Sequence, residues 1–207
     1  MQQQKSFNPW ATVWTNPRQT VRNVLATNPT AFFALLAAGG GIGQACNLAS
    51  SIGLGQSYTM GQILAFVLLT GSAAGLMSVY LWSFLLTVVG RRFGSVADAK
   101  EVRVAVAWSW APAVYLLPMW GVRYILFRDE LFLLQRPIIE ASTLLTALHQ
   151  FFGLYDLLLS FYALFILCQT VSEVSALSVW KSMIVILAVL LLMMLPAMFL
   201  FGLLATP

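Results

Sequence analysis

The sequence predicts an all-α, polytopic membrane protein: a helical bundle of about five transmembrane helices with N-terminal interfacial amphipathic helices. Of its 207 residues, 60% are hydrophobic and only 9% are charged, whereas soluble domains carry about 25% charged residues. So few charges cannot give the chain a water-soluble surface, so lipid must be the solvent for most of it. Five apolar stretches are long enough to cross a bilayer, which takes about 20 residues. None alternates with period two, which excludes strands.

Residues 1–29 are expected to form an amphipathic arm at the cytoplasmic face. Asn followed by Pro occurs three times, because Asn occupies positions 8, 16 and 28 and Pro positions 9, 17 and 29. Asn caps helices and Pro suits the first helical position, so each pair predicts a helix start. Phe7, Trp10 and Trp14 then share one helical face. We favour two short helices lying in the membrane interface, with a partner-binding arm as the alternative.

Residues 30–207 are expected to form one membrane domain. Its five predicted spans are residues 30–51, 62–89, 102–127, 144–171 and 183–204. Pro112, Pro118 and Pro196 predict kinks in the third and fifth spans, because proline lacks the N–H that a helix needs. The link over residues 128–142 mixes charged and apolar residues. It predicts a short interfacial element that Pro137 breaks.

Small residues predict that the first two spans pack together. Gly71 and Gly75 are four residues apart in the second span, and Gly39 and Gly43 have the same spacing in the first. Such faces let helices approach closely. We favour packing within one chain, with a homo-oligomer interface as the alternative.

The positions of the Lys and Arg residues predict the orientation. Three precede the first span, four lie between the second and third spans, and one lies between the fourth and fifth; these are Lys5, Arg18, Arg22, Arg91, Arg92, Lys100, Arg103 and Lys181. We assign Arg123, Arg128 and Arg136 to the link after the third span. Because cytoplasmic loops are richer in Lys and Arg, we expect an inner-membrane protein with a cytoplasmic N-terminus and an outside C-terminus.

The fourth span carries the first candidate site, an intramembrane polar seam. Ionisable groups inside a membrane are costly and need a partner or a wet cavity. The seam comprises His149, Asp156 and Ser160 on one stripe, and Tyr155 and Tyr162 on a second line. It would pass a proton, an ion or a headgroup; the alternative is a hydrogen-bond network that fixes helix register. Without a cation nearby, burial would keep Asp156 protonated, and Asp156→Asn would leave expression nearly unchanged.

Motifs for metal binding, cofactors and catalysis are missing from the sequence. There is no Cys/His cluster, no phosphate loop and no Gly-x-Ser-x-Gly elbow. Cys46 and Cys168 fall in apolar segments, which favours packing. The basic residues stand singly or in pairs between apolar runs, without a stripe for nucleic acid. We therefore expect no metal, no cofactor, no catalysis and no nucleic-acid partner.

Four segments together resemble the Yip-domain family of five-span, Ypt/Rab-interacting membrane proteins, in its short bacterial branch. They are NPWATVWTNPRQTVR at residues 8–22, VGRRFGS at 89–95, EVRVAVAWSWAP at 101–112 and SEVSALSVWK at 172–181. The resemblance implies five spans with a cytoplasmic N-terminus. Eukaryotic relatives bind small GTPases through a long cytosolic N-terminal region. This chain has only about 29 residues there, so that role is not transferred.

The resembling segments contain the second candidate site, a cytoplasmic-face charge cluster. Its members are Arg91, Arg92, Glu101, Arg103, Glu173 and Lys181. Such a cluster would bind anionic headgroups or a partner protein; anchoring and helix capping are the alternative. The leading hypothesis is a membrane scaffold or adaptor that associates with lipids and other membrane proteins. A small transporter or lipid translocase using the polar seam is the alternative.

Overall fold

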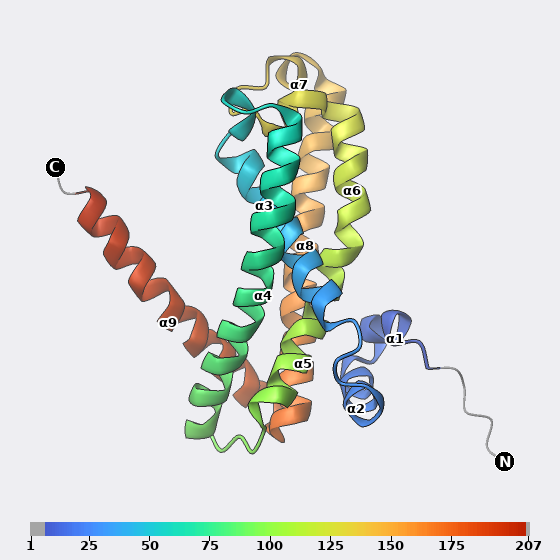
Figure 1. The fold of residues 1–207 in the computed structure, drawn as a ribbon, viewed down its shortest axis with the longest axis vertical. Helices are drawn as coiled ribbons and strands as arrows, with labels where there is room; N and C mark the ends of the chain where they lie inside the picture. The colour runs from blue at the N-terminus through green and yellow to red at the C-terminus, as the bar shows by residue number, and fades with distance from the viewer. Residues whose placement is uncertain (1–6, 206–207) are drawn as a thin grey trace. The chain divides into compact units, whose positions relative to one another are not determined.

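The structure, a computed structural model, describes residues 7–205, with side chains as far as residue 195, and these residues form helices without a strand. This confirms the all-α fold class. In chain order (Figure 1), the elements are α1 (Pro9–Thr15), α2 (Pro17–Thr27), α3 (Phe33–Ser51), η1 (Leu54–Gln56), α4 (Met60–Arg92), α5 (Ala99–Ser109), α6 (Ala111–Phe127), η2 (Arg128–Phe132), α7 (Pro137–Ala141), α8 (Thr143–Ser175) and α9 (Val179–Ala205).

The predicted spans coincide with α3, α4, α5 with α6, α8 and α9. Within the described part of the chain, three helical stretches are long and apolar enough to cross a membrane: Met60–Arg92, Ala99–Phe132 and Thr143–Ser175. The part of α9 with described side chains, Val179–Leu195, is a shorter apolar helix. α3 has 19 residues and is not among these three stretches. That α3 and α9 also span remains a prediction.

The Asn-Pro pairs begin helices at two of their three positions. α1 and α2 start at Pro9 and Pro17, and the Asn8 Oδ1 accepts a hydrogen bond from the Trp10 N–H at 3.1 Å. The third pair lies in a turn, and α3 begins four residues beyond it. The two predicted arm helices are therefore present. Lys5 lies outside the described residues.

The prolines after residue 100 start helices as well as interrupting them. α5 ends at Ser109 and α6 begins at Ala111, with Pro112 in its first turn, so the third span is two helices. Pro118 lies inside α6. Pro137 interrupts the link as predicted, because η2 ends at Phe132 and Pro137 begins α7, where its fixed φ suits the first helical position. The side chain of Pro196 lies outside the described residues.

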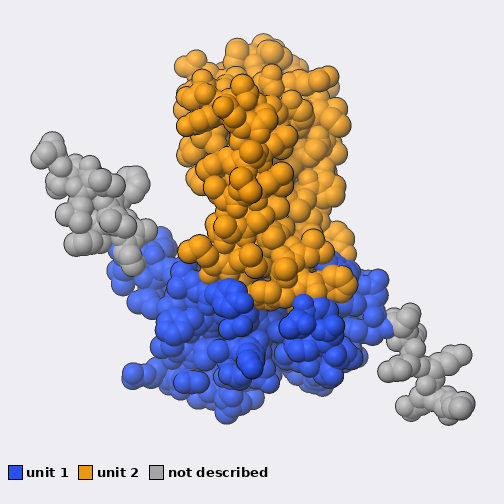
Figure 2. Space-filling view, viewed as in Figure 1, with its two compact units in different colours: residues 1–31, 80–106, 166–207 blue, residues 32–79, 107–165 orange. Residues whose placement is uncertain are grey.

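Contacts divide the chain into two compact units (Figure 2). Unit 1 comprises residues 1–31, 80–106 and 166–207, and unit 2 comprises residues 32–79 and 107–165. Unit 1 therefore contains the arm, the last part of α4, most of α5, the end of α8 and α9. Unit 2 contains α3, the first part of α4, α6, α7 and most of α8.

Glycines let α3 pack closely against α4 in unit 2, as predicted. The register differs from the prediction, because Gly41 is the glycine of α3 that faces Gly71 and Gly75. A Cβ built on Gly41 would lie 2.1 Å from the Gly71 carbonyl oxygen and 2.5 Å from the Gly75 Cα. Gly39 instead faces Val114 of α6. Residues two apart on a helix point about 200° apart, so the two positions serve different neighbours.

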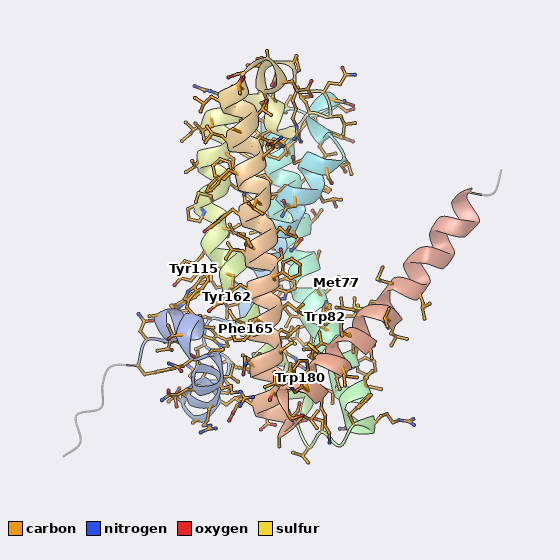
Figure 3. All side chains as sticks on the ribbon, turned by 180° about the vertical axis from the view of Figure 1, so that it is seen from behind. Met77, Trp82, Tyr115, Tyr162, Phe165 and Trp180 are labelled. Carbon is orange, nitrogen blue, oxygen red and sulfur yellow. The ribbon has the colours of Figure 1, made fainter. Side chains whose placement is uncertain are left out.

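Large apolar side chains remain exposed on the long helices. On α8, Leu158 is 58% and Phe161 is 62% exposed, and Met77 on α4 is 73% exposed. Met77 is labelled in Figure 3. Such continuous apolar surface is unfavourable in water. It fits a helical bundle whose solvent is the hydrocarbon of a bilayer.

Candidate functional site

An ion pair between α6 and α8 is the centre of the predicted seam in unit 2. Arg123 donates from its Nη2 to the Asp156 Oδ1 at 2.5 Å and from its Nη1 to the Oδ2 at 2.7 Å. The two parallel bonds form the bidentate geometry that suits guanidinium and carboxylate. Asp156 was expected to stay protonated only if no cation lay nearby. Arg123 is such a cation, so this condition is not met.

Aromatic rings and a carbonyl enclose the Arg123 guanidinium. Its central carbon lies 4.9 Å from the ring centroids of both Trp120 and Phe152, and its Nη2 also donates to the Phe152 carbonyl oxygen. The side chain is only 6% exposed, and its buried Nε has no hydrogen-bond partner. Cation–π contacts offset part of the lost hydration. Asp156 supplies the opposite charge.

Arg123 was assigned to the link after the third span, and that assignment was wrong. The residue lies inside α6 and is buried. The signal was present in the sequence, because an arginine inside an apolar run requires a partner as much as Asp156 does. Counting it only as a loop charge concealed the pair.

His149 has a separate partner in Arg136, which precedes α7. The Arg136 Nη1 donates to the His149 Nε2, while its Nε donates to the Leu133 carbonyl and its Nη2 to the Ser50 hydroxyl at 3.2 Å. A guanidinium can only donate, so the Nε2 must be the unprotonated nitrogen. Through these bonds Arg136 links His149 of α8 to Ser50 of α3.

Glu130 organises the end of unit 2 that carries Arg136. Its carboxylate accepts hydrogen bonds from the N–H groups of Ile138 and Ile139 at 2.8 and 2.9 Å. The side chain is buried, and these amides belong to the first turn of α7, where backbone donors lack helical partners. Neither Arg136 nor Glu130 was among the predicted seam residues, because their partners depend on how the loop folds back.

Two cavities adjoin the ion pair within unit 2. One, of about 180 Å³, includes Gln44, Asn47, Asp156 and Ser160 in its lining. The other, of about 240 Å³, is lined partly by Asn47, Arg123, Arg136, His149 and Asp156. Asp156 and Asn47 border both. The structure thus brings together the predicted stripe of α8 with polar residues of α3.

The other predicted seam residues contribute less to these cavities. Ser160 donates from its hydroxyl to the Asp156 backbone carbonyl at 2.8 Å. Tyr155 stacks on Phe151, and Tyr162 packs against Phe165. The two tyrosines are absent from the lining of both cavities. Tyr155 and Tyr162 therefore form a separate line, as their helical spacing predicts.

All six residues of the predicted charge cluster lie in unit 1. Glu173 pairs with Arg22 of α2 at 2.5 Å, although the Arg22 side chain is 70% exposed. Arg18 donates from its Nε to the Gln169 Oε1 at 2.7 Å and from its Nη2 to the Ser172 hydroxyl at 2.9 Å. The arm is thus attached to the end of α8 through its two arginines. The sequence did not predict this attachment.

The remaining members of the cluster have different environments. Glu101 accepts a hydrogen bond from the Asp98 N–H at 3.1 Å, which caps the start of α5. The Arg103 guanidinium lies 4.3 Å from the Tyr80 ring centroid. Arg91, Arg92 and Lys181 are exposed. We call the exposed cations Arg91, Arg92, Lys100 and Lys181 the basic end of unit 1.

The charges are distributed unequally between the units. The described residues of unit 1 hold seven Lys and Arg against three Asp and Glu, whereas unit 2 holds three against four. Among the described residues, no group of three or more His, Cys, Asp or Glu could hold a metal ion. The chemistry available is therefore electrostatic binding in unit 1 and a buried, paired polar network in unit 2.

Comparison with known families gives one finding, which agrees with the resemblance seen in four segments of the sequence. Residues 11–201 match the family described as Yip1 domain. No curated protein and no solved structure matches the chain.

Proposed function

The chain belongs to the Yip1 domain family of membrane proteins, and we propose that it acts as a scaffold or adaptor that associates with lipids and other membrane proteins. The observation that carries the proposal is the basic end of unit 1. Its cations are exposed, while the acidic residues Glu101 and Glu173 are occupied by a helix cap and an ion pair. The proposal includes no catalytic step.

The basic end suits contact with anionic partners. Cationic residues close to a membrane surface attract anionic lipids by about 1 kcal/mol each. Arg91 and Arg92 also stand in the last turn of α4, where positive charge is favourable next to the helix carbonyls. A protein partner with an acidic surface would use the same attraction.

The orientation proposed for the chain follows from the same charges. With Arg123 inside α6, the described link between the third and fourth predicted spans holds two basic residues, Arg128 and Arg136. The excess of Lys and Arg at the basic end supports a cytoplasmic N-terminus and an outside C-terminus in the inner membrane. Labelling of single cysteines introduced next to Arg92 and next to Arg128 tests this directly, because only one should react from each side.

Charge reversal tests the adaptor function. Membranes containing the wild type, Arg91→Glu with Arg92→Glu, or Arg128→Glu are cross-linked, and the membrane proteins attached to each are quantified. Arg128 is an exposed cation of unit 2 and provides the matched control. Partners of the wild type should fall at least about fivefold in the double variant, since two favourable charges become repulsive. An unchanged partner set, or no partner above an unrelated membrane protein, contradicts the proposal.

A small transporter or lipid translocase is the second candidate, favoured by the position of Asp156 between two cavities. Passage of a solute would require the Arg123–Asp156 pair to open. Asp156→Asn should then abolish uptake or lipid transfer per folded molecule while leaving the cross-linked partners in place. Undiminished transfer by that variant would exclude this use of the seam.

A further inference from the structure

The larger of the two cavities that adjoin the Arg123–Asp156 pair has a composition that the adaptor function does not require. We propose that this cavity, of about 240 Å³, is a binding site for a phosphate group, with Arg136 as its principal ligand. We call it the arginine cavity. The proposal is independent of the adaptor function, because it concerns residues of unit 2 alone.

The charge of the lining favours an anion. Two guanidinium groups, of Arg123 and Arg136, face one carboxylate, of Asp156. His149 is neutral, because its Nε2 accepts from Arg136. The nearby Glu130 carboxylate is bound to the amides of α7 and is not in the lining. Within the lining, one positive charge is therefore left without a counter-charge, which is costly in a membrane-embedded unit.

Arg136 retains hydrogen-bonding capacity for a ligand. A guanidinium has five N–H groups, and the structure assigns one bond to each of its three nitrogens. One N–H on each Nη is therefore left to donate to a ligand. Such a pair matches two oxygens of a phosphate. Arg123, in contrast, uses both Nη atoms on Asp156, so it contributes charge.

The size and opening of the cavity fit a headgroup. Sites for drug-sized ligands have about 300–1,000 Å³, so about 240 Å³ holds a phosphate group with its immediate substituents and no more. Asn47, Ser51 and Gly153 of the lining are exposed, and the cavity thus opens on the side of unit 2. From His149 to Asp156 the lining extends about 10 Å along α8.

The phosphate could come from a phospholipid or from solution, and a binding experiment separates the two. Purified protein in detergent is titrated with short-chain phosphatidylglycerol and, separately, with inorganic phosphate. Binding of the phosphatidylglycerol, with inorganic phosphate at least about tenfold weaker, identifies a headgroup site. Equal or tighter binding of inorganic phosphate identifies a soluble ligand. If the wild type binds neither, the proposal is wrong.

Two variants locate the binding. Arg136→Gln removes the principal ligand and should weaken binding at least about tenfold, whereas Arg128→Gln, an exposed arginine outside the lining, should stay within about twofold. Gly153→Leu fills the cavity from a position where a Cβ meets nothing within 4 Å, so the helix tolerates it and binding should also fall. Unchanged binding in both cavity variants, or an equal loss in Arg128→Gln, overturns the assignment.

Discussion

Asp156→Asn should destabilise the protein, because it removes the charge that compensates a buried arginine. The Arg123 side chain is 6% exposed and the Asp156 side chain 22%. Breaking a buried ion pair by changing one partner costs about 3–5 kcal/mol. The partial exposure of Asp156 places the expected loss near the lower end, about 3 kcal/mol. Without a cation near Asp156, the same substitution was expected to leave expression nearly unchanged.

A double-mutant cycle measures the pair itself. Arg123→Gln and Asp156→Asn are made singly and together, and the free energy of unfolding is measured in mild detergent by denaturant titration. The double variant leaves neither position of the pair charged, so its loss should be well below the sum of the two single losses. Glu140→Gln makes the same chemical change at an exposed residue and should stay within about 0.5 kcal/mol of the wild type.

Two results would refute this reasoning. The first is a loss below about 1 kcal/mol for Asp156→Asn, which would mean that the guanidinium does not need its counter-charge. The second is strict additivity in the double variant, which would mean that the two side chains stabilise the fold separately. The folded yield of each variant after size-exclusion chromatography should rank the variants in the same order as the free energy of unfolding.

Three further predictions concern packing, the arm and a helix cap. Gly75→Ala places a Cβ 2.1 Å from a backbone oxygen of α3 and should lower the stability measured by thermal unfolding by about 1–3 kcal/mol. The control Gly121→Ala, with open space around it, should be neutral or slightly stabilising. Equal effects of the two variants would contradict the α3–α4 packing. Glu173→Gln removes the charge that pairs with Arg22, whose side chain is 70% exposed, so the loss should be less than about 1 kcal/mol. Amide hydrogen exchange in α2 should then accelerate by no more than about fivefold, and unchanged exchange would contradict the attachment. Glu101→Ala removes a capping acceptor worth about 1 kcal/mol and should speed amide hydrogen exchange in the first turn of α5. Unchanged exchange there would mean that the cap does not stabilise the helix.

The positions of the helices could be predicted from the sequence because their causes are local. A run of about 20 apolar residues marks a membrane-length helix wherever it occurs, and Asn followed by Pro marked the starts of α1 and α2. A local rule also placed the break in the link at Pro137, which follows η2 and begins α7. The exact bounds of these helices depend on how the neighbouring segments fold.

The partners of the polar residues could not be predicted in the same way. Helical spacing placed His149 and Asp156 on one stripe, but Arg123 is 33 residues from Asp156 and Arg136 is 13 residues from His149. Spacing along one helix says nothing about which face of another helix opposes it. The attachment of Arg22 to Glu173, 151 residues apart, is a further case.

By itself, the sequence determined that this protein is a helical membrane protein of the Yip1 domain family, whose first two helices begin at Pro9 and Pro17. Composition, apolar length and capping residues depend on residues close together in the chain, so they can be recognised from the sequence alone. Only the tertiary structure decided that Asp156 is paired, that Arg123 is buried and that Gly41 faces Gly75. These outcomes depend on the rotation and register of packed helices, which no local pattern specifies.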